Sequence, residues 1–148
     1  QLDEAISHLD EVIKYSHQQY AGLAYLNKAA ILSAQNKHSE AQSVLLEVGE
    51  YKHFDKAIRE LAQITYLGNQ LNSGQADSEN TSEMLSNLTK EDKPWRLIGL
   101  QTKALYDIKN NNIVEAKASL NEILVSKQAT KSIHDVTSSI LASISKTE

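Results

Sequence analysis

A short string recurs along the chain with helical spacing, and this repetition constrains the fold more than any other feature of the sequence. In each copy a Glu-Ala pair is followed by Leu four residues after the alanine, and by an aliphatic residue three positions later. On a helix these spacings place the small residue and both larger ones on one face. The copies are Glu4-Ala5 with Leu9 and Val12, Glu40-Ala41 with Leu45 and Val48, and Glu115-Ala116 with Leu120 and Ile123. We therefore predict a stack of similar helices.

A fourth, weaker copy is predicted at Glu83-Met84 with Leu88, which spaces the anchor positions by 36, 43 and 32 residues. These intervals are close to the period of about 34 residues that is typical of helix-pair repeats. We interpret the four segments as the second helices of four pairs. The segment Asn69 to Ser82 is rich in Asn, Ser, Gly and Gln, and this composition predicts an inserted loop in the long middle interval.

The first helices of the pairs repeat as well, and they align on Ala29, Ala62 and Ala104. A small residue at a fixed place in successive helices is what close packing requires, because a larger side chain would push the helix axes apart. The aligned columns also hold small residues five positions earlier, Ala24, Ala57 and Gly99, and large rings nine positions earlier, Tyr20, His53 and Trp95. We expect Tyr20 and Trp95 to lie at helix starts and to pack on the preceding pair.

The whole chain is expected to form one all-α domain over residues 1–148. One proline and five glycines leave few helix breakers. The predicted segments are a half-repeat at 1–15, helix pairs at 18–50, 53–89 and 94–126, and a C-terminal capping helix at 130–146. An apolar stripe of Ile133, Val136, Ile140, Leu141 and Ile144 would face the last pair. Because the helical pattern is already under way at Gln1, we interpret the chain as a fragment that lacks its N-terminal part.

Charge and residue types argue against several functions. The formal net charge is -4, and no block of Lys and Arg is present, which disfavours nucleic acid and anionic lipid as ligands. The sequence has no run of about 18 apolar residues, so we predict no membrane insertion by this chain. The five histidines are scattered without metal-ligand spacing, and neither a nucleophile elbow nor a Gly-rich phosphate loop occurs. We expect no metal, no cofactor and no catalytic activity. Since cysteine is absent, thiols leave the compartment open.

The alanine, leucine and aliphatic columns resemble the tetratricopeptide repeat over nearly the whole chain. This resemblance implies antiparallel helix pairs that stack as a right-handed superhelix. Leu32, Thr65 and Asp107 stand where the family has an aromatic residue, and the proline that closes each repeat is missing, which leaves the repeat boundaries open.

A narrower resemblance concerns the segment that begins at Pro94-Trp95-Arg96-Leu97 and continues through Leu100, Lys103-Ala104-Leu105 and Glu115-Ala116-Lys117. It is similar to the C-terminal part of bacterial membrane-anchored tetratricopeptide-like proteins, among them the ancillary subunit of the Sec translocon. The similarity implies a periplasmic or otherwise extracytoplasmic domain, attached through a missing N-terminal segment. A cytoplasmic location is the alternative.

In the resembled family the first helices line a concave wall, which predicts a groove that binds an extended or helical peptide. Its middle would be basic, and Arg59 would suit a bidentate contact with a carboxylate. The alternatives are packing against a neighbouring helix for the apolar members, and an ordinary solvated face for Lys56 and Arg59. The candidate residues are Leu23, Leu26, Lys56, Arg59, Gln63, Tyr66, Ile98 and Gln101, with Ala30, Ser33, Leu105 and Ile108 completing the same series.

The predicted function is a non-catalytic protein–protein interaction scaffold that binds a protein or peptide and assists an envelope or secretion complex. The alternative is a structural helical repeat that self-associates into homo-oligomers. A regulator that binds nucleic acid or a small ligand is a third hypothesis, and the dispersed charge speaks against it.

Overall fold

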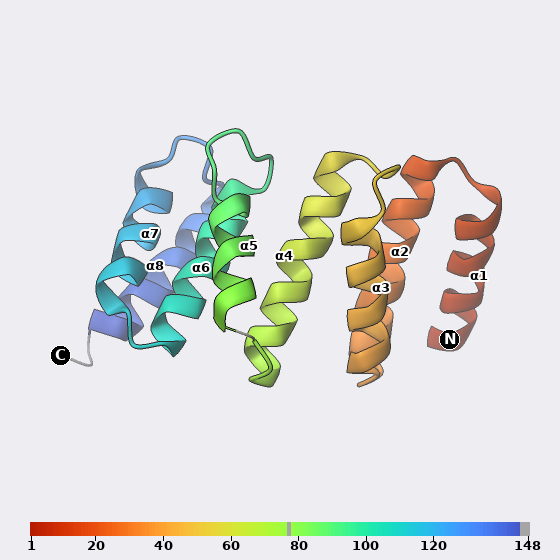
Figure 1. The fold of residues 1–148 in the computed structure, drawn as a ribbon, viewed down its shortest axis with the longest axis horizontal. Helices are drawn as coiled ribbons and strands as arrows, with labels where there is room; N and C mark the ends of the chain where they lie inside the picture. The colour runs from red at the N-terminus through yellow and green to blue at the C-terminus, as the bar shows by residue number, and fades with distance from the viewer. Residues whose placement is uncertain (77, 146–148) are drawn as a thin grey trace. The chain divides into compact units, whose positions relative to one another are not determined.

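The computed structural model describes residues 1–76 and 78–145, which form eight α-helices and no strand, so this part of the chain is all-helical (Figure 1). The observed bounds lie within three residues of the predicted segments, and residue 146, the predicted end of the last helix, lies outside the described residues. None of the described helices combines the length and the apolarity that crossing a membrane requires. The helices are α1 (Leu2–Tyr15), α2 (Gln18–Ala34), α3 (His38–Glu50), α4 (Lys56–Ser73), α5 (Ser78–Leu88), α6 (Arg96–Lys109), α7 (Ile113–Val125) and α8 (Lys131–Ser145).

The chain divides into two compact units, Gln1–Asn69 and Gln70–Glu148. The first contains α1, α2, α3 and most of α4, and the second contains the last turn of α4 followed by α5 to α8. Within the first unit α2 packs on both α1 and α3, and within the second α7 packs on both α6 and α8. Each unit therefore builds its core from consecutive helices.

A shift of 75 residues relates the pattern of α2 to α4 to that of α6 to α8. The Ala, Leu and aliphatic residues of the second helices face the core in both units, where they are at most 1 % exposed; they are Ala41, Leu45 and Val48 on α3, and Ala116, Leu120 and Ile123 on α7. The aligned alanines of the first helices, Ala29, Ala62 and Ala104, are at most 2 % exposed. The small-residue columns predicted from the sequence thus mark buried helix faces.

Three first helices end in the same kind of turn. Asn36 after α2, Gly74 after α4 and Asn111 after α6 have φ values of 61°, 72° and 60°, a left-handed conformation that Gly and Asn adopt more easily than other residues. The following N–H donates to the carbonyl five positions back in each case, from Lys37 to Leu32 at 2.9 Å, from Gln75 to Gln70 at 3.0 Å and from Asn112 to Asp107 at 2.8 Å. These bonds satisfy helix-end carbonyls and turn the chain toward the next helix.

The predicted register of the fourth copy is wrong. On α5 the buried residues are Thr81, Leu85 and Leu88, which are 4 %, 1 % and 3 % exposed, whereas Met84 is only partly covered. Thr81 therefore takes the place of the alanine, because its side chain is small enough for close helix packing. The alignment on Met84 followed the preceding glutamate, which is exposed and does not determine packing.

The predicted loop from Asn69 to Ser82 is also wrong, because most of it is helical. α4 continues to Ser73 and α5 begins at Ser78. Ala62 lies twelve residues before the left-handed Gly74, whereas Ala29 lies seven before Asn36, so the insertion lengthens α4 by more than one turn. Leu67 and Leu71, four residues apart and 1 % and 5 % exposed, continue its buried face. The polar composition of the segment concealed this spacing.

Two further expectations about packing are corrected. Tyr20 is 62 % exposed, since it lies in the first turn of α2 at the edge of the core, while Trp95 is half-buried just before α6. On α8, Val136 is 50 % exposed and Thr137 is fully buried. The Thr137 hydroxyl donates to the carbonyl of Ile133 at 2.7 Å and accepts from the Gln101 amide at 2.8 Å, and these bonds allow a polar residue in the buried stripe.

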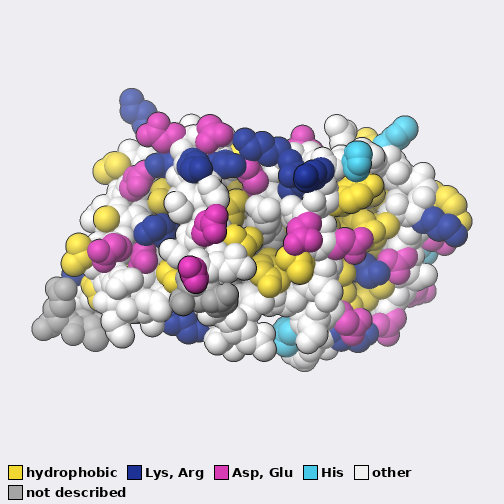
Figure 2. Space-filling model, in the orientation of Figure 1, with side chains coloured by type: hydrophobic (Ala, Val, Ile, Leu, Met, Phe, Trp, Pro, Cys, Tyr) yellow, Lys and Arg dark blue, Asp and Glu magenta, His cyan; other side chains and the backbone are white. Residues whose placement is uncertain are grey.

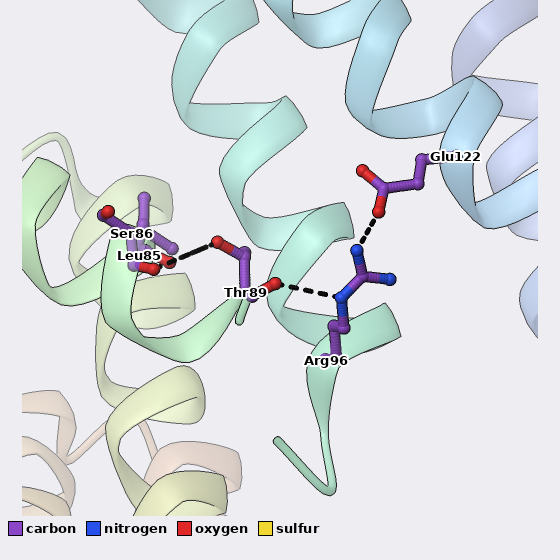
Figure 3. A network of polar contacts seen from close by, with 5 residues as sticks. All are labelled: Leu85, Ser86, Thr89, Arg96 and Glu122. Atoms are coloured by element: carbon purple, nitrogen blue, oxygen red, sulfur yellow. Dashed lines mark hydrogen bonds and ion pairs between the residues drawn. The ribbon is translucent and has the colours of Figure 1, made fainter. Parts of the chain in front are cut away.

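Polar contacts also connect α5, α6 and α7 in the second unit (Figure 3). The Arg96 guanidinium donates from Nε to the carbonyl of Thr89 at 3.0 Å and pairs with the carboxylate of Glu122 on α7. The Thr89 hydroxyl donates to the Leu85 carbonyl at 2.9 Å. Arg96 therefore caps the C-terminal end of α5, where a positive charge is favourable.

Candidate interaction surface

Two neighbouring apolar depressions lie on the first unit, on either side of the exposed face of α2. One, of about 420 Å³, is bounded by α2, α3 and α4, and the other, of about 520 Å³, by α1 and α2. The first is lined by Leu26, Ala29, Ala30, Ser33, Leu45, Leu61, Thr65 and Asn69, and the second by Ala5, His8, Leu9, Val12, Asn27, Ala30 and Ile31. Because Ala30 lines both, we treat them as one surface, which we call the apolar trough.

The trough is open because small side chains occupy its floor. At the positions 75 residues later in the second unit, Leu105 replaces Ala30, Ile108 replaces Ser33 and Ile140 replaces Thr65. There, Ile108 and Ile140 pack against the core that contains Ala104, Leu120 and Ile144. The same helix arrangement is thus filled by its own aliphatic side chains in one unit and left open in the other.

Of the two predicted groove residues on α2, Leu26 lines the trough and Leu23 does not. Leu26 lines the depression between α2 and α4, and Leu23 is 50 % exposed on the same helix. Ala30 and Ser33, which completed the predicted series, line the trough as well.

The four predicted residues on α4 do not line the trough. Gln63 donates from Nε2 to the carbonyl of Gly49 at 3.1 Å, and Tyr66 is half-buried and packs on the core of the first unit. Arg59 donates from Nε to the carbonyl of Phe54 at 3.2 Å, and Lys56 is exposed with its Nζ 4.0 Å from Glu60. A Cβ placed on Gly49 would lie 2.9 Å from the Gln63 side chain, so this face of α4 crosses α3 closely.

The two predicted residues on α6 are also engaged within their own unit. Gln101 donates to Thr137 of α8 at 2.8 Å, and Ile98 is half-buried. α8 therefore takes the face of α6 that the prediction left for a ligand. The described side chains of α4 and α6 therefore do not form a groove with a basic middle.

The sequence reading missed the contributions of α1 and the trough side of α4. Leu61 and Thr65 are four residues apart and line the trough from α4, while Leu9 and Val12 line it from α1. On α1, Leu2 and Val12 remain 48 % and 37 % exposed and no residue is buried, a property that local spacing does not reveal.

Charges around α1 separate into two sets. Asp10 pairs with Lys28 of α2 at 2.6 Å, and Asp3 accepts from Gln35 at 2.9 Å and lies 3.8 Å from Lys37. Glu4 and Glu11 lie on the other side of α1, beside His8 by helical spacing, and both are exposed. The edge of the trough formed by α1 is therefore acidic.

Chemically, the trough offers aliphatic and small polar side chains. His8 is the one ionisable residue among those that line it. Within the described residues, no group of three or more His, Asp or Glu is arranged to hold a metal ion. Lys and Arg side chains are intermixed with Asp and Glu on the visible face of each unit (Figure 2). The trough is suited to burying apolar side chains of another molecule.

Fold and surface together define an all-helical chain in two compact units, with an exposed apolar trough on its first unit. The chain belongs to the family described as protein of unknown function (DUF2659), which matches residues 2–144. An uncharacterised protein of Rickettsia prowazekii (strain Madrid E) is 23 % identical over 145 residues, which make up 96 % of this chain and 66 % of that protein. The chain thus spans slightly less than two thirds of the length of this relative. No solved structure matches the chain.

Proposed function

We propose that the chain is a non-catalytic protein–protein interaction scaffold that binds a protein or peptide partner. The observation that carries this proposal is the apolar trough, whose two parts measure about 420 and 520 Å³. A partner that covered this surface would remove its apolar side chains from water, which is favourable. The trough is lined from α1, α2, α3 and α4, and rigid helices are suitable elements on which to hold a binding surface.

We further propose that the helix pairs stack as a tetratricopeptide-like right-handed superhelix with α8 as a cap. The recurring buried alanines and the left-handed turns after α2, α4 and α6 support this arrangement. Ala62 follows Ala29 by 33 residues, and Thr137 follows Ala104 by the same interval, which is close to the period of about 34 for such repeats. A solution scattering curve of the chain, compared with one calculated for the superhelix, tests the arrangement.

The proposed location is extracytoplasmic, with the chain held near a membrane and assisting an envelope or secretion complex. Its support is the resemblance of the segment from Pro94 to Lys117 to bacterial anchored proteins. The chain contains no cysteine, so Val114→Cys, at a residue 77 % exposed on α7, provides a single labelling site in this region. Labelling of intact cells by a membrane-impermeant maleimide is expected. Labelling only after lysis would favour the cytoplasm.

The scaffold function is tested by photo-crosslinking in a bacterium that carries the protein. A benzophenone amino acid replaces Asn27, which lines the trough, or Val114, which lies on α7 in the other unit. A discrete crosslinked protein obtained at position 27 and absent at position 114 is expected. Identical products at both positions, or none at position 27, would contradict the proposal.

Self-association is the second candidate, because the second unit exposes aliphatic side chains. Leu105 is 44 % exposed and Val136 is 50 % exposed. These side chains would be covered if another copy packed on them. Light scattering distinguishes the two candidates, since a monomer of 16.4 kDa at high protein concentration counts against self-association. A dimer that Leu105→Ser with Val136→Ser dissociates would favour it.

A further inference from the structure

We propose that the apolar trough binds a short amphipathic peptide segment with branched aliphatic anchors flanked by Lys or Arg. The proposal rests on the scaffold function and specifies its site and the chemistry of its partner. It combines the size and apolarity of the trough, the filled equivalent in the second unit, and the charge along the edge of α1.

The lining determines the anchors. Leu26 and Leu61 face one depression and Leu9 and Val12 the other, with Ser33, Thr65, Asn27 and Asn69 at intervals among them. Aliphatic anchors bury apolar area against the leucines, and the hydroxyl and amide groups provide hydrogen-bonding partners for the backbone of a bound segment.

The second unit shows which side chains fill such a space. Positions equivalent to Ala30, Ser33 and Thr65 hold Leu105, Ile108 and Ile140 there, and Ile108 and Ile140 pack on that unit's own core. Isoleucine side chains at the positions equivalent to Ser33 and Thr65 therefore fit this helix arrangement. A segment that brings these side chains from another molecule restores the packing that the first unit lacks.

Charge complementarity determines the flanks. Asp3 and Asp10 contact polar and basic groups in or just after α2. Glu4 and Glu11 lie on the exposed outer side of α1, where Glu11 Oε2 is 3.8 Å from His8 Nδ1 and 71 % of the Glu11 side chain remains accessible. Two carboxylates one helical heptad apart attract basic side chains and repel acidic ones. The same carboxylates disfavour nucleic acid and anionic lipid at this edge.

The test uses the whole chain and three fluorescein-labelled peptides of about twelve residues with matched helical spacing. The first combines Leu anchors with Lys flanks, the second has Glu in place of Lys, and the third has Ala in place of Leu. Fluorescence anisotropy measures binding. The Leu/Lys peptide is expected to bind at least about tenfold more tightly than either of the others.

Two variants localise the binding. Ala30→Leu with Ser33→Ile introduces the residues of the second unit, fills the trough without changing charge, and is expected to weaken Leu/Lys binding about tenfold. Leu105→Ala is its control on the second unit and is expected to leave binding unchanged.

The charge variant Glu4→Lys with Glu11→Lys is expected to reverse the preference between the Lys and Glu peptides. Its control, Glu91→Lys with Glu115→Lys, changes an exposed pair elsewhere and is expected to keep the preference. Helicity by circular dichroism verifies that each variant is folded.

Equal affinity for the Lys and Glu peptides, or unchanged binding by folded Ala30→Leu with Ser33→Ile, would overturn the proposal. So would a dimer that this variant dissociates, since the occupant would then be a second copy of the chain. A crosslinked partner at Asn27 together with failure of all three peptides refutes the inferred chemistry and leaves the scaffold function standing. Absence of a partner in both experiments refutes the scaffold function itself.

Discussion

Gln101 on α6 donates a hydrogen bond of 2.8 Å to the hydroxyl of Thr137 on α8, and Thr137 is completely buried. Thr137 stands 33 residues after Ala104, as Ala62 does after Ala29, so α8 has the character of another first helix. In the first unit the residue equivalent to Gln101 is Leu26, which lines the trough instead. One polar pair thus occupies in the second unit the helix face that the first unit leaves open.

Thr137→Val keeps the shape of the side chain and removes its hydroxyl. The Gln101 amide would retain the longer contact to the Ile133 carbonyl, at 3.3 Å, and lose its better partner. We expect the free energy of unfolding to fall by about 1 kcal/mol, measured by urea denaturation. Thr65→Val is the control, because Thr65 is exposed and bonds to its own helix at Leu61; an equal loss in both variants would contradict the prediction.

Asn36 and Asn111 should tolerate glycine better than alanine. Both have φ near 60°, and Gly74 occupies the same place after α4. Asn36→Ala is expected to lower the free energy of unfolding by about 1 kcal/mol, since a side chain without local hydrogen bonds disfavours this conformation, while Asn36→Gly leaves it nearly unchanged. Thermal unfolding followed by circular dichroism compares them. Equal melting temperatures for the two variants would show that the left-handed turn does not limit stability.

Gly99 and Gly68 should respond oppositely to alanine. A Cβ at Gly99 would lie 3.0 Å from the Leu88 carbonyl oxygen, which is backbone, whereas a Cβ at Gly68 meets no described atom within 4 Å. Gly99→Ala is therefore expected to cost about 1–3 kcal/mol through strain, and Gly68→Ala to gain up to about 1 kcal/mol from helix propensity. Urea midpoints measure both. Destabilisation by Gly68→Ala would indicate a close contact at that position.

Tyr25 predicts a loss of stability at alkaline pH. Burial raises its pKa above the ordinary value of 10.0; Glu47, Asp10 and Tyr51 raise it further, and Lys28 opposes them. The stabilising contribution of the neutral phenol is fully present below pH 10 and is lost as the pH rises through the higher pKa of the folded state, because the unfolded chain ionises first. Tyr25 also packs edge-on against Phe54, with ring centroids 5.9 Å apart.

The measurement is the urea midpoint of the wild type and of Tyr25→Phe at pH 9 and pH 11. We expect the wild type to lose more stability over this interval than Tyr25→Phe, which cannot ionise at this position. Tyr20→Phe, at a residue 62 % exposed, should behave as the wild type. If all three proteins lose the same amount, Tyr25 does not contribute to the alkaline transition.

Sequence periodicity located the helices and their buried faces with good accuracy. The prediction was wrong where residue composition was used in place of this spacing. The segment from Asn69 to Ser82 was interpreted as a loop from its polar residues, although Leu67 and Leu71 continue α4 and Thr81, Leu85 and Leu88 define the face of α5. The same spacing that identified Ala41, Leu45 and Val48 describes Thr81, Leu85 and Leu88. The repeat spacing was therefore present in the sequence of α5. It starts from the small residue, and the position of the glutamate does not indicate it.

By itself, the sequence determined where helices form and which stripe of each is apolar, because these properties depend on neighbours three and four residues away. Only the tertiary structure decided which apolar stripes stay open. Leu26 is exposed to the trough since Ala30, Ser33 and Thr65 are small, while Gln101 is engaged because Thr137 lies opposite it. Exposure depends on the size of side chains that approach from distant parts of the chain, and local spacing contains no information about them.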